Sequence, residues 1–566
     1  MRPENGKYIE ANIGKKSVSQ ISKELGLKEK KIRRYLEEKK QTHTGKDAEA
    51  KIQPVRRKTK VISFLLLVGI VAAVYANSLG GPFLFDDKTL VESNPLIRTI
   101  SNVPFFFKTD IFAHDLEKEP LSNSYRPIQT ITYALDFLLW GNDSRGFHLT
   151  NILIHIFNIL LVFLLIRKLF NDVYLAYFVS LLFGINPANT ACVSYVSGRA
   201  DILVAAFMLL AIMFYVSYSR NGGWVFLLFS VLSYLFAVYS KEYAIVTLPL
   251  VLFIYNAVFD RKNIFKIKSY IFYVLPLLCY FPLRMSAFKG VATRSLELSK
   301  ISLLPRLMTS LKTLFIDIRI IFLPYDLHFG RTTDIEYSIF GSLYSILTVL
   351  GLILALYVLK TSYKSWISGK KAQSGILFFG ISWFTVSMIP LLNIFPLQVF
   401  NADNWLYFSS IGAYLVFSSI IVHVWRLIYK KKMFFRDAFS FSIVLMFIVY
   451  GYGTVQRNRD YQSEIKFYLS SVKWRPNIKF YRVIGAIYGQ KGDYGNAVKY
   501  LEKAVETNRI YPSPEITEVY YVLGVTYMRL SEYTKAEENF KKVLASDSEA
   551  LKTEAQKQLL YIKQRQ

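Results

Sequence analysis

Long apolar segments alternate with short polar connections through most of this 566-residue chain. A helix needs about 20 mostly apolar residues to cross the hydrocarbon core of a bilayer. Eleven segments meet this requirement, at residues 61–79, 148–167, 173–191, 201–218, 223–240, 243–259, 269–287, 338–360, 375–393, 405–425 and 437–454. The pattern therefore predicts an all-α, polytopic membrane protein with about eleven spans.

Two further segments are apolar on one face only. Ile128–Trp140 is interrupted by Asp136, and Leu307–Pro324 is interrupted by Asp317 and Arg319. One-sided apolar helices of this kind lie in the membrane interface. We expect both to lie there on the outer side, because a crossing by either one would move every later connection to the opposite side.

The distribution of charge predicts the orientation. Hydrophobic residues make up 52% of the chain and charged residues 19%, yet the formal net charge is +28. Lysine and arginine remain in cytoplasmic connections, and they collect in alternate loops, "IRKLFND", "YSRNGG", "FDRKNIFKIK", "LKTSYKSWISGKKAQ" and "WRLIYKKKMFFRD". We expect these loops and the basic N-terminus to be cytoplasmic, and residues 80–147, 288–337 and the C-terminal part to face outward.

The C-terminal part contains an internal repeat. "YRVIGAIYGQKGDYGNAVKYLEKAV" and "YYVLGVTYMRLSEYTKAEENFKKVL" carry small and aromatic residues at the spacing of a tetratricopeptide helix pair. The first unit has Gly485, Tyr488, Ala497, Leu501 and Ala504, and the second has Gly524, Tyr527, Ala536 and Phe540. Arrays of this kind usually need three units, so we expect a degenerate repeat at 461–480, or docking onto the membrane domain, to support the two.

The N-terminal part is small and basic. "SVSQISKELGLKEKKIRRYLEEKK" has helix-turn-helix spacing, with Gly26 at the turn and a basic second helix that carries Lys30, Lys31, Arg33 and Arg34. Residues 1–60 hold 18 Lys and Arg against 8 Asp and Glu. Such a surface suits nucleic acid phosphates, and it equally suits a topology signal attracted to anionic lipid.

Candidate chemistry begins with two adjacent carboxylates, Asp86 and Asp87, in "GGPFLFDDKTLVESN" on the first external loop. Charged residues at span ends are costly unless they are paired or functional. The outer face also holds a group of cations and polar residues, namely Arg126, His148, Arg199, Lys241, Glu242, Arg284 and Asp403. This set suits transfer from a lipid-linked phosphate donor, in which cations stabilise the leaving phosphate and a carboxylate accepts a proton from the attacking hydroxyl. Repulsion between the neighbouring carboxylates is expected to raise the pKa of one of them.

The ordered motifs resemble a known family. "FLFDDKTLVESNPLI", "YRPIQTITYALD", "FHLTNILIHIFN", "LLFGINPANTACVSYVSGRADIL", "SKEYAIVTLPL" and "NWLYFSSIGAY", followed by the repeats, are similar to the transmembrane and tetratricopeptide-repeat O-mannosyltransferases. These enzymes belong to the GT-C glycosyltransferase superfamily. The resemblance implies a polyprenyl- or dolichyl-phosphate sugar as donor, inversion at the anomeric carbon and protein Ser or Thr as acceptor.

The resemblance also implies roles for individual residues. Asp86 becomes the catalytic base and Asp87 its positioning partner, while the donor phosphate is assigned to Arg126, Arg199, Lys241 and Arg284. Relatives commonly have an arginine after the acidic residue that corresponds to Asp403, whereas this chain continues with Asn404 and Trp405. Arg284 or Lys289 is the candidate replacement.

Supporting roles fall to His148, Glu242, His328 and Asp403. Glu242, next to Lys241, is equally well interpreted as a member of a local ion pair. No histidine and carboxylate cluster has metal-ligand spacing, so we expect no cofactor, with a divalent ion held by Asp86 and Asp87 as the alternative. Cys192 and Cys279 lie far apart in apolar context, which argues against a disulfide framework.

Three domains are expected: a basic helix-turn-helix-like headpiece at 1–60, a GT-C-like membrane domain at 61–460 with external loops at 80–147 and 288–337, and an external repeat domain at 461–566. The predicted function is transfer of a sugar, mannose by resemblance, from a polyprenyl phosphate to a protein hydroxyl at the outer face of a prokaryotic cytoplasmic membrane. Its partners would be membrane lipid, the lipid-linked donor and an acceptor protein bound through the repeats. Two alternatives remain, a non-catalytic scaffold that recruits partners through its repeats and a membrane-tethered regulator whose headpiece binds DNA.

Overall fold

The structure is a computed structural model. It describes residues 8–9, 12, 16–27, 29, 32, 57–113, 122, 124–264, 270–288, 297–331, 333–338, 341–369, 372–397, 399–429 and 433–564. The chain divides into two compact units, Met1–Val68 and Gly69–Gln566. The second unit contains both the apolar helices and the repeats.

The first unit contains α2 (Val18–Leu25). Its start is fixed by a capping box, in which the Ser17 hydroxyl accepts the Gln20 N–H and the Gln20 side chain accepts the Ser17 N–H. Gly26 ends the helix with a φ of +60°, a left-handed conformation that glycine adopts at low cost. Apolar side chains of Ile9, Ile21 and Ile32 form a small core. The basic residues of the expected second helix, Lys30, Lys31, Arg33 and Arg34, lie outside the described residues.

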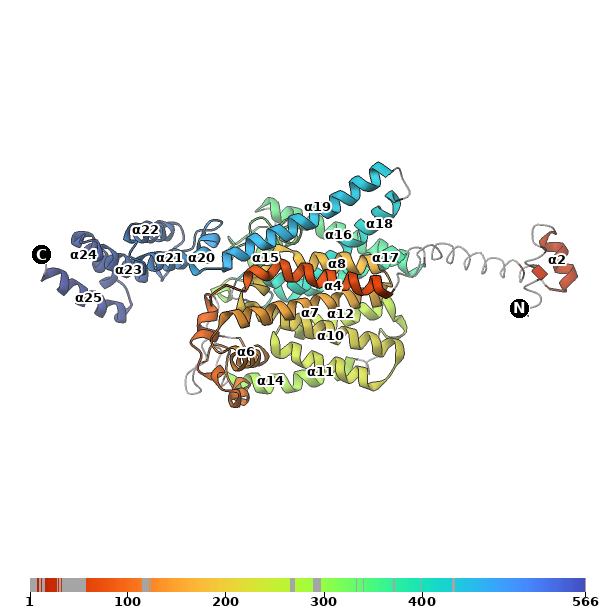
Figure 1. The fold of residues 1–566 in the computed structure, drawn as a ribbon, viewed down its shortest axis with the longest axis horizontal. Coiled ribbons are helices and arrows are strands. Elements are labelled where there is room, and N and C mark those ends of the chain that lie inside the picture. Colours follow the sequence, from red (N-terminus) through yellow and green to blue (C-terminus); the bar gives the residue numbers. More distant parts are fainter. Residues whose placement is uncertain are drawn as a thin grey trace. The chain divides into compact units, whose positions relative to one another are not determined.

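The described secondary structure of the second unit is helical (Figure 1). The longer helices that precede the repeats are α4 (Arg57–Tyr75), which begins in the first unit, α6 (Pro127–Trp140), α7 (Ser144–Phe170), α8 (Val173–Ile185), α10 (Arg199–Asn221), α11 (Trp224–Ser240), α12 (Ala244–Phe259), α14 (Leu275–Ala287), α15 (Leu303–Phe322), α16 (Leu343–Ile367), α17 (Ala372–Met388), α18 (Leu406–Ile428) and α19 (Met433–Asn458).

Short helical turns connect them. These are η1 (Ala76–Ser78), η2 (Lys88–Glu92), η3 (Leu96–Arg98), η4 (Ile100–Asn102), α5 (Val103–Phe106), η5 (Pro187–Asn189), α9 (Thr190–Val193), η6 (Val196–Gly198), η7 (Arg261–Asn263), η8 (Phe272–Val274), η9 (Glu297–Lys300), η10 (Ile389–Leu391), η11 (Asp403–Trp405) and η12 (Arg459–Tyr461).

Six helices in the described part of the chain are long and apolar enough to cross a membrane, and α8 with the bent segment after it makes a seventh. Four shorter apolar helices, Phe64–Ser78, Trp224–Ser240, Ala244–Phe259 and Phe272–Ala287, complete the set. Each of the eleven predicted segments corresponds to one of these helices. The all-α, multi-pass fold class is therefore confirmed, whereas the count of eleven spans is not, because the shorter helices fall below the usual length. Neither α6 nor α15 belongs to either group.

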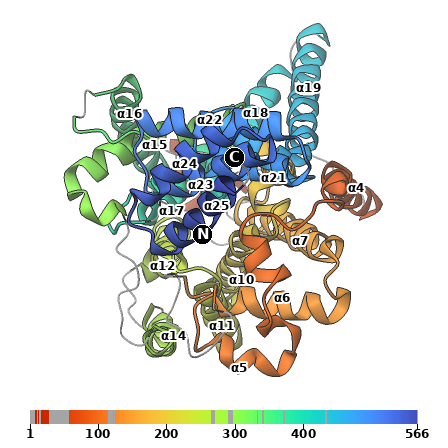
Figure 2. The same ribbon diagram turned by 90° about the vertical axis from the view of Figure 1, so that its left-hand side faces the viewer.

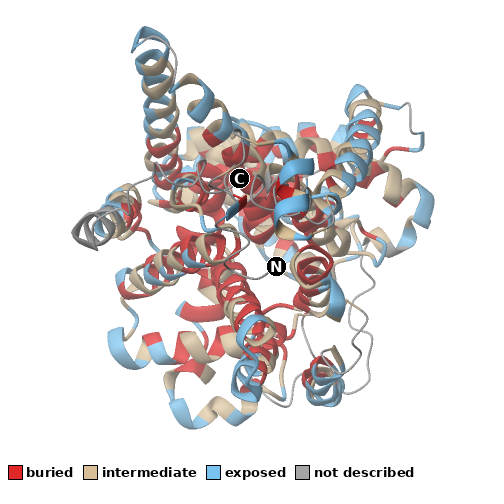
Figure 3. Cartoon of the chain, turned by 90° about the vertical axis from the view of Figure 1, so that its right-hand side faces the viewer, coloured by how far each residue is buried: buried red, intermediate tan, exposed pale blue. Residues whose placement is uncertain are grey.

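The helical body is organised around α10. The span from Val196 to Asn221 has 78% of its apolar stretch inside the protein, whereas α16 has only 11%. Buried residues accordingly gather in the inner helices, and exposed ones lie on the outer helices (Figure 3). α10 packs against α7, α11, α12 and α18, and α6 lies across the ends of α7, α10 and α11 (Figure 2). Most of the predicted site residues lie in the first turns of α7 and α10 or in the connections that precede α6, α12 and α18.

The repeat domain consists of α20 (Glu464–Val472), α21 (Ile478–Gln490), α22 (Tyr494–Ile510), α23 (Ile516–Arg529), α24 (Tyr533–Leu544) and α25 (Glu549–Lys563). The predicted small residues lie where helices cross closely. A Cβ added to Gly485 would lie 2.5 Å from Leu501 Cγ, and one added to Gly524 would lie 2.7 Å from a ring atom of Phe540. α20 and α25 extend the array at its two ends, so the two predicted units are supported on both sides.

Candidate active site

The two aspartates lie on a tight turn of the loop 81–94, which we call the acidic loop. The Asp87 N–H donates to the Leu84 carbonyl, 2.8 Å away, and the Leu84 N–H donates back to Asp87 Oδ2 at 3.0 Å. The turn forces Phe85 to a φ of +45°, which is uncommon for a residue other than glycine. Such strain persists only where surrounding structure imposes it, and it concentrates at functional sites. A π-helical turn, η2, follows immediately.

Asp87 points inward and is fully buried. Its Oδ1 accepts the Ser197 N–H at 2.7 Å and also the Ser197 hydroxyl. Burial raises the pKa of Asp87 to about 7, while the bonds from Ser197 and Leu84 oppose the rise. Repulsion from Asp86 is the smallest of these effects. The expected cause of the raised pKa is therefore corrected, because burial outweighs the neighbouring charge.

Asp86 occupies a different environment, although it is the next residue along the chain. Its side chain is partly exposed, and its N–H donates to the Tyr195 hydroxyl at 3.1 Å. Burial raises the pKa of Asp86 above the ordinary value, and Tyr195, Lys479 and Arg126 oppose that rise. Asp86 thus combines solvent access with a raised pKa, which are the properties that a general base requires.

Two of the predicted cations meet at Glu242. Arg126 Nε lies 3.7 Å from Glu242 Oε2, and Arg284 Nη1 lies 3.5 Å from Oε1. The Tyr125 N–H also donates to Oε1, at 3.1 Å. Burial works to raise the pKa of Glu242, but the two arginines hold it below the ordinary value. About a quarter of each arginine side chain is exposed beside this carboxylate.

Arg199 has a different role from the one predicted. It is fully buried and pairs with Asp136 at 2.6 Å. Its Nε donates to Asn151 Oδ1 at 2.7 Å, and Nη2, the nitrogen that pairs with Asp136, also donates to the Phe147 carbonyl at 2.9 Å. These contacts join α6, α7 and α10 and commit the guanidinium group to the protein interior. We therefore reassign Arg199 from phosphate binding to a structural ion pair.

Lys241 is likewise buried and paired. Its ammonium group lies 2.6 Å from Asp201 Oδ1, and the Asn404 amide donates to the other oxygen at 2.7 Å. Asn404, the residue after Asp403, thus contacts this pair from η11, directly before α18. The expectation that Lys241 binds phosphate is corrected in the same way, because the described contacts occupy its charge.

His148 contacts the backbone of the acidic loop. Its Nε2 lies 3.1 Å from the Gly81 carbonyl, and the side chain is buried near the start of α7. A Cβ added to Gly81 would lie only 3.0 Å from the same imidazole. The described contacts of His148 thus reach the backbone of the acidic loop and neither aspartate, and its supporting role stays a prediction.

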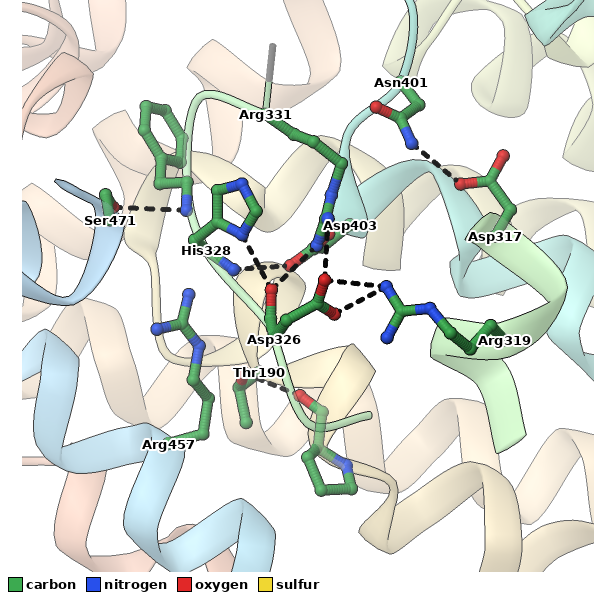
Figure 4. Close-up of polar contacts among 12 residues, drawn as sticks. Thr190, Asp317, Arg319, Asp326, His328, Arg331, Asn401, Asp403, Arg457 and Ser471 are labelled. Atoms are coloured by element: carbon green, nitrogen blue, oxygen red, sulfur yellow. Dashed lines mark hydrogen bonds and ion pairs between the residues drawn. The ribbon is translucent and has the colours of Figure 1, made fainter. Parts of the chain in front are cut away.

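His328 and Asp403 belong to a buried ionic network (Figure 4). Asp403 accepts two bonds from Arg331, at 3.0 and 3.2 Å, and the His328 N–H at 3.1 Å. Asp326 accepts two bonds from Arg319, each of 2.7 Å. Arg331, which no sequence pattern indicated, is thus the arginine that pairs with Asp403. Lys289, the other candidate replacement, lies outside the described residues.

The imidazole of His328 is held within this network. Its Nδ1 donates to the Asp326 carbonyl at 2.7 Å, and Nε2 is buried without a hydrogen-bond partner among the described residues. Burial and the Arg331 charge lower the pKa of His328. Its neighbour Phe329 contacts Phe85, with ring centroids 5.1 Å apart. The network therefore reaches the acidic loop through Phe329. In the described part of the chain, no group of three His, Cys, Asp or Glu residues is placed to hold a metal ion.

Comparison with known proteins identifies the relatives. The protein O-mannosyl-transferase TMTC3 of Homo sapiens is 26% identical over 518 residues, which cover 84% of this chain and 54% of the human protein. The protein O-mannosyl-transferase F38B6.6 of Caenorhabditis elegans is 26% identical over 463 residues, covering 78% of this chain and 63% of that protein. The chain is homologous to the protein O-mannosyl-transferases. It spans between half and two-thirds of the length of these relatives.

Two further comparisons concern parts of the chain and its fold. The family model "Tetratricopeptide repeat" matches residues 478–511 and 517–549, so both predicted repeat units are confirmed. The comparisons give no support to the helix-turn-helix prediction. Among solved structures, the oligosaccharyltransferase of Archaeoglobus fulgidus tethered to an acceptor peptide aligns with a TM-score of 0.44 and 14% identity, over 78% of this chain and 59% of that one.

Three residues around the aspartates were not among the predicted set. Tyr195 and Ser197 lie in the "VSYVSGRAD" motif, four and two residues before Arg199, so the motif that contains Arg199 already pointed to this segment. Lys479 is separated from Asp86 by almost four hundred residues and belongs to the repeat domain. Its proximity depends on how the repeats pack against the acidic loop, which a repeat pattern does not specify.

Proposed function

We propose that the protein is a membrane glycosyltransferase of the GT-C type, which moves mannose from a polyprenyl-phosphate donor to a Ser or Thr hydroxyl of a protein. The observation that supports this most directly is the partly exposed Asp86 on an external loop, electrostatically coupled to the Arg126–Glu242–Arg284 cluster. Homology to the protein O-mannosyl-transferases agrees with this chemistry.

The reaction would be a single displacement. The acceptor oxygen gives its proton to Asp86 and forms a bond to the anomeric carbon, while the bond from that carbon to the phosphate oxygen breaks. The electron pair leaves with the lipid phosphate, and inversion follows from attack on the opposite side. Arg126 and Arg284 would bind the phosphate and stabilise the charge that develops on it.

Asp87 would act by positioning. Both of its oxygens are engaged, one by Ser197 and the other by the Leu84 N–H. These bonds fix the turn that presents Asp86. Asp87 thus connects the acidic loop to the start of α10, and its role is to hold the base in place.

The orientation and the acceptor contact are part of the same proposal. We place the N-terminus in the cytoplasm of a prokaryote and the acidic loop with the repeats at the outer face of the cytoplasmic membrane. α22, α23 and α24 enclose a groove of about 720 Å³, whose lining includes Lys499, Lys503, Glu506, Arg509 and Lys542. Such a groove suits an extended protein segment, and we assign it to the acceptor.

A donor screen tests the proposal. Purified protein is incubated with a panel of polyprenyl-phosphate sugars and an acceptor extract, and release of lipid phosphate is followed for wild type, Asp86→Asn and Asp143→Asn. Asp143 is a matched control because it lies on the same external loop and caps α7, a role that Asn also fills. We expect turnover with the mannosyl donor in wild type and in Asp143→Asn only.

Two results would count against the proposal. Equal turnover by Asp86→Asn would remove Asp86 as the base. No turnover with any donor would favour the non-catalytic scaffold, for which the Asp86 substitution has no consequence.

A further inference from the structure

The first helices of the repeat domain pack directly onto the acidic loop. Leu84 and Tyr195 belong to the same apolar core as Phe467 and Phe480 of the repeat domain. An ion pair of 2.7 Å joins Lys88, on the loop, to Glu464 of α20. The repeat domain is thus in contact with the turn that holds the two aspartates, and not only with an acceptor.

A second contact fixes this docking from the side of the ionic network. The Phe329 N–H donates to the Ser471 hydroxyl of α20 at 3.3 Å (Figure 4). Gly330 has a φ of +67°, and a Cβ at that position would lie 2.7 Å from the ring of Phe480. The absence of a side chain at Gly330 thus lets the Phe480 ring of α21 pack close to the loop backbone.

α21 contacts Phe85, the acidic-loop residue that has the strained, positive φ. The ring of Phe85 lies 5.1 Å from that of Phe329 and 6.3 Å from that of Phe480. The ammonium group of Lys479, in the first turn of α21, lies 5.1 Å above the centre of the Phe85 ring. A cation over an aromatic face is attracted to it. Lys479 is therefore held beside the residue that immediately precedes Asp86.

Several charged or titratable groups act on Asp86. Asp87 belongs to its own loop, Tyr195 to the segment before α10, Tyr468 to α20, Arg126 to the start of α6 and Lys479 to α21. Arg126 shares its charge with Glu242. Lys479 makes no ion pair with any other described residue. Of the two described cations that act on Asp86, Lys479 is thus the one without an ion-pair partner among the described residues.

We propose that Lys479 is a positioning residue of the active site, through which the repeat domain supplies the positive charge that keeps Asp86 ionised. Its catalytic meaning rests on the proposed function of Asp86 as the base. The repeats would then complete the site in addition to binding the acceptor. Loss of the Lys479 charge raises the pKa of Asp86 further, since an opposite charge nearby favours the ionised carboxylate.

The test measures the ionisation of Asp86 without requiring turnover. Carbodiimides activate protonated carboxyl groups, so the labelling of Asp86 by a carbodiimide and an amine is followed by peptide mass spectrometry between pH 4.5 and 8. The full-length variants are Lys479→Met, Lys479→Gln, Lys479→Arg and the control Lys491→Met, at the opposite end of α21. The exposed Asp547 serves as an internal reference for reagent activity.

We expect the labelling midpoint of Asp86 to move up by about 0.5–1 pH unit in Lys479→Met and in Lys479→Gln, since the charge is lost in both. Lys479→Arg, which keeps the charge, should restore the wild-type midpoint, and Lys491→Met should not change it. A midpoint that is the same in wild type and in both neutral variants would overturn the proposal.

The same variants separate this inference from the proposed function. If the wild type turns over a donor, the acid limb of its pH–rate profile should shift with the labelling midpoint in the neutral variants. If the wild type turns over no donor, the proposed function fails, while labelling still decides whether Lys479 controls Asp86. A uniform loss of rate at every pH, with no shift, would identify Lys479 as structural only.

Discussion

Two adjacent aspartates in this protein have different environments because the chain turns between them. The positive φ of Phe85 brings the turn into a conformation in which Asp87 points into the interior and Asp86 remains partly exposed. Asp87 is thus fully buried, whereas Asp86 has access to solvent. In the proposed mechanism, the same residue type would serve for positioning and for proton transfer within one loop.

The raised pKa of Asp87 predicts how stability depends on pH. The folded pKa is about 7 against 3.8 for an ordinary aspartate, so the folded state binds the proton more tightly. Its contribution to stability is fully present below pH 3.8 and is lost as the pH rises through 7. The melting temperature of wild type minus that of Asp87→Asn, measured in detergent, should therefore fall between pH 5 and pH 8.

Asn at position 87 does not titrate. The other titratable groups are the same in wild type and variant, so their contributions cancel in the difference between the two melting temperatures. At pH 5 the substitution should cost about 1–3 kcal/mol, because the amide cannot accept from all the donors that face it. Asp143→Asn should give a difference that does not change with pH. A difference for Asp87→Asn that grows with pH would contradict the assigned pKa.

At the scale of elements, α6, α7 and α10 are joined by the buried Arg199–Asp136 pair. Removing one partner of a buried pair leaves an uncompensated charge and costs about 3–5 kcal/mol. Arg199→Met should therefore lower the melting temperature strongly, whereas Arg436→Met, at an exposed pair, should have little effect. Equal effects of the two substitutions would mean that Arg199 is not committed to Asp136.

Docking of α21 on the loop 326–331 gives a second prediction. Gly330 and Gly369 both have a φ of +67°, but only a Cβ at Gly330 meets another residue, the ring of Phe480. Gly330→Ala should thus reduce both thermal stability and sugar transfer. Gly369→Ala should cost only the backbone strain that both variants share. Identical behaviour of the two variants would show that the contact with Phe480 does not hold the repeat domain in place.

Sequence patterns predicted the elements better than the contacts between them. The eleven apolar segments and both repeat units followed from periodicity and composition, because these depend on local residue spacing. The partners of Arg199 and Lys241 did not, since the burial that pairs them with Asp136 and Asp201 depends on how distant helices pack. Arg331 and Lys479 were missed for the same reason, whereas Asp86 and Asp87 were found because a contiguous motif carries them.

For the whole molecule, the proposed function requires that the acidic loop and the repeats lie on the same side of the membrane. The contacts of Lys88 with Glu464 and of Phe85 with Phe480 already place them together. The distribution of lysine and arginine predicts the outer side.

Cysteine labelling in intact cells tests this orientation. In a Cys279→Ser background, with Cys192 fully buried, single cysteines are introduced by Glu538→Cys in the repeats or Ser368→Cys between α16 and α17. A membrane-impermeant maleimide should react with the first in intact cells and with the second only after lysis. The reverse pattern would contradict the proposed topology.

The most direct test of the central claim separates binding from turnover at Asp86. The affinity for polyprenyl-phosphate mannose and the rate of lipid phosphate release are measured for wild type and Asp86→Asn under the same conditions. If Asp86 is the base, donor affinity should stay within a few-fold, and the rate should fall by about 10²–10⁴-fold, the usual contribution of general base catalysis. An unchanged rate, or a rate that falls only in proportion to lost donor affinity, would contradict the account.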